Sequence, residues 1–425
     1  GKTRVDVTKP KFFVTFPYPY MNGRLHLGHA FTLMKADIMA RLKRKQGFEV
    51  LFPFAFHGSG TPIVSCADKV KMGDAGQIKI LRDMDVPEEE IRNFTDPYHW
   101  IRYFPEKAVG DLKNLAVSAD FQRSFMTTSM NPHYDSFIQW QFEKLRKVGV
   151  LTYGKRHMIF SPDTNQPCSD HDRSKGEGVS PLEYTLIKLP LVETVKTQSD
   201  LCLLAATLRP ETLYGQTNIW VNKKGVYALF NYQGTKCIAR IQVYRNFCYQ
   251  VEDKSSVQLL DENFITGQEL IGCHVNAPMT STPISIYHME QVSMNRGTGI
   301  VTSVPSDSPT DYLYWREICK KKGTPMSIKE IIEVKGDRTI AVTGVESSKI
   351  KVGQKAKLEE LHQKIYLEEH EHGIMLVGDH EGVSTKEAHG KIKSDLISSE
   401  DGIVYYEPQT PVISRSGVEC VVSLT

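Results

Sequence analysis

The hydrophobic pattern of the N-terminal segment predicts two strands joined by a helix. Residues 11–16 form a β-branched and aromatic run that ends at Pro17, and residues 48–52 form a second run; both suit buried strands. Between them, residues 30–45 carry apolar side chains at helical spacing and finish in a basic cluster before Gly47, which is typical of a helix end. The apolar positions of this helix are Ala30, Leu33, Met34, Ile38 and Leu42. Strand, helix and strand in this order predict a right-handed parallel βαβ unit.

A different pattern covers the chain from about residue 176 to residue 408. Short β-rich runs broken by turn residues follow one another there, as in a compact β-rich insertion rather than a continued doubly wound sheet. We also expect Glu88–Glu90 to open a helix and Lys320–Lys322 to end one before Gly323. The clearest β runs are Ile187–Val192, Leu201–Thr207, Ile300–Val304 and Gly373–Val377.

The composition is that of a globular protein of about two domains. The chain has 425 residues, of which 40% are hydrophobic and 24% charged, with a mean hydropathy of −0.32, and this length exceeds one compact core. No apolar run reaches the roughly 18 residues needed to cross a membrane. The 30 Gly and 21 Pro are too few for a disordered or fibrous chain. Eight cysteines without a Cys-x-x-Cys pair indicate a reduced, cytosolic chain rather than a disulfide scaffold.

The net charge and the first residues of the chain give little further information about function. A net charge of +2 gives no overall attraction to nucleic acid, so any such contact needs a local basic surface. We interpret the basic cluster at residues 41–45 as a helix end rather than as an RNA contact. The chain opens with Gly1, and residues 2–11 lack the apolar core of a signal peptide, so we interpret this start as an imposed boundary.

Two histidines lie between the first predicted strand and the helix. His26 and His29 are three residues apart, at the carboxyl end of a parallel strand, where open α/β proteins bind ligands, and at a helix start, which favours phosphate. Both imidazoles can donate to phosphate oxygens, and Gly28 lets a backbone or a flat base approach closely. A zinc pair or two surface histidines are the alternative interpretations of the same spacing.

His-Leu-Gly-His at residues 26–29, after Pro-Tyr-Pro-Tyr-Met-Asn-Gly at 17–23, resembles the "HIGH" motif of class I aminoacyl-tRNA synthetases. The extended form is similar to the cytosolic eukaryotic and archaeal leucyl type. The resemblance extends over nearly the whole chain, with further matching blocks at 54–63, 139–149 and 161–173. It implies an α/β fold in which a class I Rossmann-like catalytic domain carries an inserted β-rich α/β editing domain. The implied boundaries are 1–175 for the first half of the catalytic domain with its connecting region, 176–410 for the editing domain and 411–425 for the return segment.

The resemblance assigns roles in amino-acid activation to the first segment. The amino-acid carboxylate attacks the α-phosphate of ATP in line, so positioning and charge stabilisation are the main tasks of the protein. His26, Gly28 and His29 are implied to form the catalytic motif. Phe16 is interpreted equally well as pocket or as ordinary core, and His57 is implied to place the leucine ammonium or carboxylate. The implied ATP-binding residues are Asn22, Gly23, His26 and His29, and the implied leucine-binding residues are Phe16, Tyr18, Tyr20 and His57.

Two loops of the second segment resemble the editing domain of the leucyl family. One is a threonine-rich peptide after residue 205, and the other is a Gly-Thr-Gly segment at 297–299 followed by aspartates. An apolar pocket separates amino acids that differ by one methyl group by only ~1–3 kcal/mol. Norvaline, isoleucine and methionine therefore require a second, hydrolytic pocket. The sequence shows no Ser/His/Asp triad or metal nucleophile here, so we expect positioned water to cleave the ester.

The implied roles in this editing pocket divide between anchoring and exclusion. Asp311 is implied to anchor the substrate α-ammonium, and Asp307 is a competitor for that role. Thr212 is implied to exclude the γ-branched side chain of leucine by steric contact. The remaining implied residues are Thr207 and Arg209, which contact the ribose, the phosphate or the attacking water, and Thr302 and Val304, which line the pocket.

The resemblance also implies reactants and setting: ATP with Mg²⁺ as a substrate, leucine and tRNA(Leu), in a cytoplasmic protein without membrane contact. We expect a monomer, able to join a multi-synthetase complex. Cys168, Asp170, His171 and Asp172 lie where bacterial relatives carry a zinc knuckle, but one Cys and one His are too few for a closed four-ligand site, so we predict no zinc. The family's Lys-Met-Ser-Lys-Ser loop does not occur, so we expect the N-terminal half of the family's length. An editing-only hydrolase and a leucine-sensing or RNA-binding scaffold stay open as alternatives.

Overall fold

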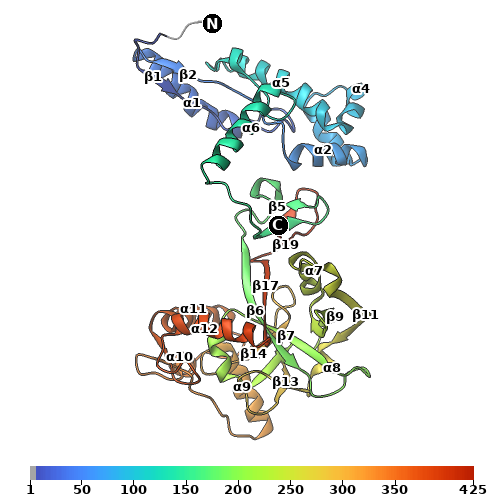
Figure 1. Cartoon of the computed structure of the whole chain (residues 1–425), viewed down its shortest axis with the longest axis vertical. Coiled ribbons are helices and arrows are strands. Elements are labelled where there is room, and N and C mark those ends of the chain that lie inside the picture. The colour runs from blue at the N-terminus through green and yellow to red at the C-terminus, as the bar shows by residue number, and fades with distance from the viewer. Residues whose placement is uncertain (1–5) are drawn as a thin grey trace. The chain divides into compact units, whose positions relative to one another are not determined.

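The computed structural model describes residues 6–425, with the exception of the side chains of residues 261–263. The chain divides into two compact units, which are described separately (Figure 1). The domain boundaries expected from the sequence differ from this division and stay a prediction. The first unit consists of Gly1–Gly154, Ser169–Glu177 and Ile413–Val418, and the second of Lys155–Cys168, Gly178–Val412 and Glu419–Thr425.

The first unit begins with the predicted βαβ unit, but its two strands are not buried as expected, since Phe13 is 60% exposed and Leu51 42% exposed. Strand β1 (Lys11–Phe13) pairs in parallel with β2 (Glu49–Leu51), and helix α1 (Leu27–Lys45) is the crossover between them. The last turn of α1 is basic, as expected. Arg44 donates to the carbonyl oxygen of Ser118 at 2.9 Å, and the Lys43 ammonium lies 4.7 Å from the centre of the Phe48 ring. The basic cluster thus forms the end of the helix, and two of its side chains contact residues of the same unit.

Helix α1 is confirmed, but its apolar stripe does not coincide with its buried face. Leu33, Asp37 and Ala40 are buried, whereas Ile38 is 64% exposed and Leu42 45% exposed. The buried Asp37 carboxylate accepts hydrogen bonds of 2.7 Å from the backbone N–H and the hydroxyl of Ser118 and from Arg41. These partners satisfy a charge that burial would otherwise penalise. On this helix a polar side chain, Asp37, is therefore buried, whereas the apolar side chains of Ile38 and Leu42 are exposed.

Helices make up most of the remaining first unit. All but the last of them pack around an aromatic core that contains Phe52, Phe54, Phe94, Trp100 and Phe104, whereas the last, Pro132–Lys147, has no buried residue. Glu88–Glu90 form the first turn of α4, as predicted. A short antiparallel pair, β5 (Arg173–Lys175) with β18 (Ile413–Ser414), completes the unit. The helices are α2 (Thr61–Lys71), α3 (Ala75–Asp83), α4 (Glu88–Ile91), α5 (Pro97–Asn114) and α6 (Pro132–Lys147).

The second unit is the β-rich part that the sequence predicts. Its main sheet has six strands in the order β11-β9-β10-β7-β6-β17, and a second sheet has the order β12-β13-β8-β14. The main sheet contains β6 (Pro181–Pro190), β7 (Leu201–Thr207), β9 (Val226–Tyr232), β10 (Thr235–Ala239), β11 (Val257–Thr266) and β17 (Gly402–Pro408). The second sheet contains β8 (Asn218–Val221), β12 (His274–Val275), β13 (Ile284–His288) and β14 (Ile300–Ser303).

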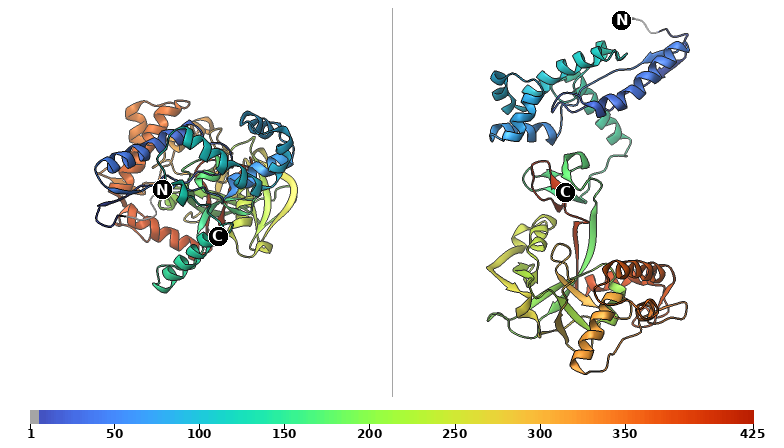
Figure 2. Two further views of the ribbon diagram at one scale, coloured as in Figure 1. Left: turned by 90° about the horizontal axis from the view of Figure 1, so that it is seen from above. Right: turned by 180° about the vertical axis from the view of Figure 1, so that it is seen from behind.

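The main sheet buries apolar side chains on both faces, because successive residues of a strand point to opposite sides. Leu204 packs with Val243 and Phe247 of helix α7 (Ile241–Gln250), on one face. Leu203, on the other face, belongs to the core that includes Ile219 of β8 and Ile392 of α12 (Thr385–Ser398). Figures 1 and 2 show α10, α11 and α12 on one side of this unit, with α7 and β11 on the opposite side.

Several of the remaining elements lie where the sequence pattern predicts them. Helix α9 (Pro309–Lys322) ends in the predicted basic turn, and Gly323 caps it with a φ of 64°. The four predicted β runs correspond to parts of β6, β7, β14 and β16. A small sheet has the order β19-β3-β4. These elements are α8 (Gly267–Leu270), α10 (Ile340–Ser348), α11 (Lys355–His372), β15 (Ile332–Val334), β16 (Gly373–Met375), β3 (His157–Ser161), β4 (Gln166–Pro167) and β19 (Val421–Leu424).

Candidate active sites

The two motif histidines form a reciprocal cap at the start of α1. His26 is the N-cap residue, and its Nδ1 accepts the backbone N–H of Gly28 at 3.1 Å. The backbone N–H of His26 in turn donates to Nδ1 of His29 at 3.2 Å, and the two ring centres lie 4.0 Å apart. A Cβ at Gly28 would lie 2.9 Å from Cε1 of His26. The helix start thus fixes both rings, and it requires glycine between them.

This cap also determines which nitrogens of the rings can act as donors. In a neutral imidazole one nitrogen accepts and the other carries the proton. Since both Nδ1 atoms accept backbone N–H groups, both protons lie on Nε2. Burial and the neighbouring His26 lower the pKa of His29, which keeps that ring neutral. The result is a pair of Nε2–H donors at the positive end of a helix, an arrangement suited to an anionic ligand.

Both histidines line a cavity of about 540 Å³ in the first unit. Arg24 forms part of its wall and is held by Asp111, to which its Nη2 donates at 2.7 Å. Two of the residues predicted to bind ATP, Asn22 and Gly23, do not line the cavity. A Cβ at Gly23 would lie 2.7 Å from Cε of Met84. The cavity is lined by Phe16, Arg24, Leu25, His26, Leu27, His29, Ala30, Leu33, Asp83, Met84, Asp111, Leu112 and Leu115.

His57 belongs to a separate polar cluster of the first unit. Its ring nitrogens lie 3.2 Å from the hydroxyls of Ser59 and Thr127. Its ring centre lies 4.5 Å from that of Tyr20, which also stacks on His171 at 5.6 Å. Burial lowers the pKa of His57, and the nearby His171 lowers it further. The ring is therefore neutral, and its hydrogen-bond partners fix its orientation. The structure therefore brings His57 and Tyr20 together, and it adds His171, which sequence reasoning did not place here.

The other two predicted pocket aromatics have different surroundings. Phe16 is 4% exposed and stacks on Phe54 with ring centres 5.7 Å apart, while also lining the histidine cavity. Both interpretations of Phe16, core and pocket wall, therefore describe its position. Tyr18 is half-buried and meets Phe125 edge-on at 5.4 Å.

In the second unit, both threonines of the predicted editing peptide bond to the backbone of Arg209. The backbone N–H of Arg209 donates to the Thr207 hydroxyl at 2.9 Å. The Thr212 hydroxyl donates to the carbonyl oxygen of Arg209 at 2.8 Å. Thr207 ends β7, and Thr212 lies in the 3-10 helix η4 (Pro210–Gly215). We call residues 207–212 the threonine turn; its shape depends on the position of Arg209.

The segment that directly follows the threonine turn lies against β14 and the loop after it. Strand β14 pairs antiparallel with β8, and the backbone N–H of Thr217 donates to the carbonyl oxygen of Ser303 at 3.0 Å. A Cβ at Gly215 would lie 3.2 Å from the Ser306 hydroxyl. Thr302 and Val304 of this segment are 7% and 8% exposed. The fold therefore brings together two loops that are far apart in the sequence, as the editing resemblance implies.

Two buried aspartates follow β14, in different surroundings. Asp311 is 5% exposed and accepts from Nε1 of Trp220 at 2.9 Å and from the backbone N–H of Val304 at 3.0 Å. Burial raises its pKa to about 6. Asp307 is 1% exposed and accepts from the Ser306 hydroxyl. Burial raises the pKa of Asp307 to about 6 as well. Each carboxylate has acceptor capacity left, so the choice between them as the ammonium anchor stays open.

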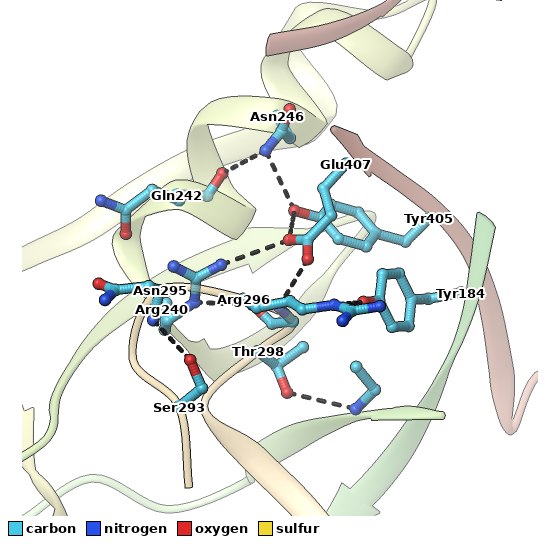
Figure 3. A network of polar contacts seen from close by, with 12 residues as sticks. Tyr184, Arg240, Gln242, Asn246, Ser293, Asn295, Arg296, Thr298, Tyr405 and Glu407 are labelled. Atoms are coloured by element: carbon cyan, nitrogen blue, oxygen red, sulfur yellow. Dashed lines mark hydrogen bonds and ion pairs between the residues drawn. The ribbon is translucent and has the colours of Figure 1, made fainter. Parts of the chain in front are cut away.

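A buried ion pair holds the Gly-Thr-Gly segment (Figure 3). Arg240 and Glu407 lie 3.3 Å apart, and their side chains are 5% and 6% exposed. Arg240 Nε donates to the carbonyl oxygen of Gly297 at 2.7 Å, and the N–H of Gly297 donates to Glu407 at 2.7 Å. The Thr298 hydroxyl then accepts from the backbone N–H of Ala206 at 3.2 Å. This network joins the Gly-Thr-Gly segment to the residue that precedes the threonine turn.

Within residues 6–425, leaving aside the side chains of 261–263, no group of three or more His, Cys, Asp or Glu side chains is arranged to hold a metal ion. The prediction of no zinc stays a prediction. Among the described helices, none is long and apolar enough to span a bilayer.

A family model for class I tRNA synthetases of the I, L, M and V types matches residues 2–303. The chain belongs to the class I tRNA synthetases. This membership agrees with the βαβ unit that carries the two histidines and with the inserted β-rich unit. The α/β fold class expected from the sequence is thereby confirmed.

Curated relatives of this class I synthetase chain are leucine enzymes. "Leucine--tRNA ligase, cytoplasmic" of Pongo abelii is 38% identical, over 99% of this chain and 41% of that protein. "Leucine--tRNA ligase" of Methanopyrus kandleri is also 38% identical, over 97% of this chain and 44% of that protein. The chain thus spans less than half the length of these relatives. A solved structure described as GlLeuRS-CP1 is similar with a TM-score of 0.47 and 30% identity, covering 53% of this chain and 100% of that one.

Sequence reasoning missed the residues that hold the threonine turn and the Gly-Thr-Gly segment of this synthetase chain in place. Arg240, Glu407 and Glu369 are buried charged residues of the second unit, and each acts on a partner far away in the sequence. No motif marks them. A charged residue inside a run that is otherwise apolar, such as Glu407 after Tyr405 and Tyr406, is the one local signal available.

Proposed function

We propose that this chain is part of a leucine–tRNA ligase, with one site that activates leucine and another that hydrolyses mischarged tRNA(Leu). Two relatives at 38% identity over nearly the whole chain are named leucine–tRNA ligases. Because the chain spans 41% and 44% of their lengths, we expect complete aminoacylation to need more of the protein. The substrates are leucine, tRNA(Leu) and ATP with its Mg²⁺, and several relatives carry cytoplasmic in their names, which supports that location.

The histidine pair carries the proposal for the activation site. The leucine carboxylate attacks the α-phosphorus of ATP, and the bond to the pyrophosphate oxygen breaks as negative charge moves onto the leaving group. His26 and His29 present Nε2–H donors at a helix N-terminus beside a cavity of about 540 Å³. Donors fixed before the reaction stabilise developing charge without reorganisation. Gly28 leaves the space that this geometry needs.

Leucine is placed by the cluster around His57. The hydroxyls of Ser59 and Thr127 hold the His57 ring, and Tyr20 packs against it. A neutral imidazole fixed in this way can orient the ammonium or the carboxylate, while the aromatic faces of Tyr18 and Tyr20 cover an aliphatic side chain. Asn22 and Gly23 act from behind the histidine segment, since the cavity does not include them.

The editing site works by anchoring and exclusion. An ionised Asp311, or Asp307 in its place, binds the α-ammonium of the aminoacyl ester. Thr212 excludes the γ-branched side chain of leucine, while Thr302 and Val304 line the pocket. Water held by hydroxyl and backbone groups near Thr207 and Arg209 attacks the ester carbonyl, and the ribose hydroxyl leaves with a proton. A second candidate, an editing-only hydrolase, is favoured by the fact that the editing residues all lie within one compact unit.

Leucine-dependent exchange of pyrophosphate into ATP tests the activation site. We expect exchange with the full-length ligase that contains this chain and a fall of about 10²–10³-fold when His29 is replaced by Ala. Replacing the exposed His370 by Ala on the second unit is the matched control, with unchanged exchange. If the full-length protein exchanges no pyrophosphate with leucine but hydrolyses mischarged tRNA, the editing-only candidate replaces the ligase.

A further inference from the structure

Arg209 is the centre of the threonine turn, and two carboxylates hold its side chain. Its backbone N–H and carbonyl oxygen bond to the hydroxyls of Thr207 and Thr212. Its guanidinium lies 3.1 Å from Glu211 and 2.5 Å from Glu369, and is 15% exposed. Glu211 is a neighbour in the sequence, whereas Glu369 comes from helix α11. A displacement of the guanidinium would therefore move the backbone to which both threonines are bonded.

Glu369 is unusual among the charged residues of this unit, because it is entirely buried. Its exposed fraction is 0%, and neither carboxylate oxygen has a hydrogen bond of good geometry in the part of the chain that the structure describes. Its compensation is the ion pair with Arg209, together with a contact to the Asp307 carboxyl. The Thr385 hydroxyl donates to the backbone carbonyl of Glu369, which fixes where the side chain starts. A buried carboxylate is costly unless it is paired, so the Arg209 contact determines its place.

We propose that Glu369 is a positioning residue of the editing pocket, which holds Arg209 and thereby sets the Thr212 side chain that discriminates against leucine. This inference rests on the proposed editing function. Glu369 does not touch the substrate; it acts through Arg209. Thr212 can exclude a γ-branched side chain only while its hydroxyl stays bonded to the Arg209 carbonyl, because that bond fixes its rotamer. Loosening Arg209 therefore reduces selectivity more than it reduces hydrolysis itself.

The charges around the guanidinium support this assignment. Glu211 is shared, because its second oxygen lies 2.8 Å from Nδ1 of His389 on helix α12. Asp307 also faces Arg209, and burial raises the pKa of both Asp307 and Glu369, with Arg209 acting in the opposite direction. Two buried carboxyls beside one guanidinium share a proton as a pair. Glu211 therefore contacts both His389 and Arg209, and Glu369 supplies the second fixed contact to the Arg209 guanidinium.

The experiment compares hydrolysis of norvalyl-tRNA(Leu) and leucyl-tRNA(Leu) by the chain and its Glu369→Gln variant. Glutamine keeps the shape of the side chain but cannot ionise, so it cannot form the ion pair with Arg209. We expect the ratio of kcat/KM for norvalyl over leucyl ester to fall about tenfold through the loss of that ion pair. Glu371→Gln, on the same helix with a side chain that is 60% exposed, is the matched control and should keep the wild-type ratio. A merely structural role would lower both rates together and leave the ratio unchanged.

A folded Glu369→Gln protein with the wild-type ratio would overturn the inference. Should this variant fail to fold, Glu369→Asp is tested in the same way, since it keeps the carboxyl group and leaves Arg209, Glu211 and Asp307 in place while shortening the reach to the guanidinium. The Glu369→Asp variant is expected to hydrolyse leucyl ester at an increased relative rate, and a wild-type ratio contradicts the proposal. If the wild-type chain hydrolyses neither ester, the proposed editing function fails, and this inference fails with it.

Discussion

Replacing Asp311 with Asn tests what burial does to the candidate ammonium anchor. Burial raises the pKa of Asp311 from 3.8 to about 6, so the folded protein binds this proton more tightly than the unfolded chain does. An acid with a raised pKa contributes its full stability where both states are protonated, and the contribution falls as pH rises from about 4 to above 6. The wild-type protein should therefore lose stability, relative to Asp311→Asn, as the pH increases.

The size of this effect follows from the two pKa values. At about pH 7.5 both states are ionised, and the shift of about 2 pKa units costs about 3 kcal/mol. At about pH 4.5 the unfolded carboxyl is largely ionised while the folded one is protonated, and the cost is about 1 kcal/mol. The difference in unfolding free energy between wild type and Asp311→Asn should thus change by about 2 kcal/mol between these conditions. Hydrogen-bond changes caused by the amide itself do not depend on pH and cancel in this comparison.

Urea unfolding followed by tryptophan fluorescence measures the effect, because Trp220 donates to Asp311 and reports on this unit. The same variant should lose deacylation of norvalyl-tRNA(Leu) by about 10–100-fold in kcat/KM, as expected for a lost charge-assisted contact with the substrate ammonium. A free-energy difference that is the same at both pH values would refute the reasoning about burial. Wild-type deacylation by Asp311→Asn would instead transfer the anchor role to Asp307.

Three further substitutions test other contacts. His26→Ala in the full-length ligase should lower leucine-dependent pyrophosphate exchange about 10²–10³-fold with unchanged deacylation, and a loss of less than threefold would contradict the role of the His26 and His29 donors. Thr212→Ala should let the chain hydrolyse leucyl-tRNA(Leu), measured as release of radiolabelled leucine; if that ester is still spared, steric exclusion by Thr212 is wrong. Arg240→Met should destabilise the second unit by about 3–5 kcal/mol in urea unfolding, because it leaves the buried Glu407 unpaired. A cost below about 1 kcal/mol would show that Glu407 finds another partner.

Local patterns were sufficient to predict many individual elements. The βαβ unit, the basic end of α1 and strand β7 (Leu201–Thr207) follow from periodicity, capping residues and β-branched runs. These signals depend on residues within one turn or one strand, and such residues report directly on their own backbone. The positions of His26 and His29 at a helix start were predictable for the same reason.

Contacts between distant residues were not predictable in this way. The buried face of α1 includes Asp37 because Ser118 supplies two hydrogen bonds from 81 residues away, and no local pattern contains that partner. Glu369 and Arg209 are likewise brought together only by the fold. The sequence pattern identifies which residues can do chemistry, whereas their fixed orientation comes from charged partners that periodicity does not reveal.

The central claim is that one chain carries, in addition to the histidine site, a separate pocket that hydrolyses mischarged tRNA according to the size of the amino acid. Mixing the purified chain with norvalyl-tRNA(Leu) and, separately, with leucyl-tRNA(Leu) tests it most directly. We predict rapid release of norvaline and slow release of leucine. Equal rates, or release of neither amino acid above the rate without protein, would contradict the account.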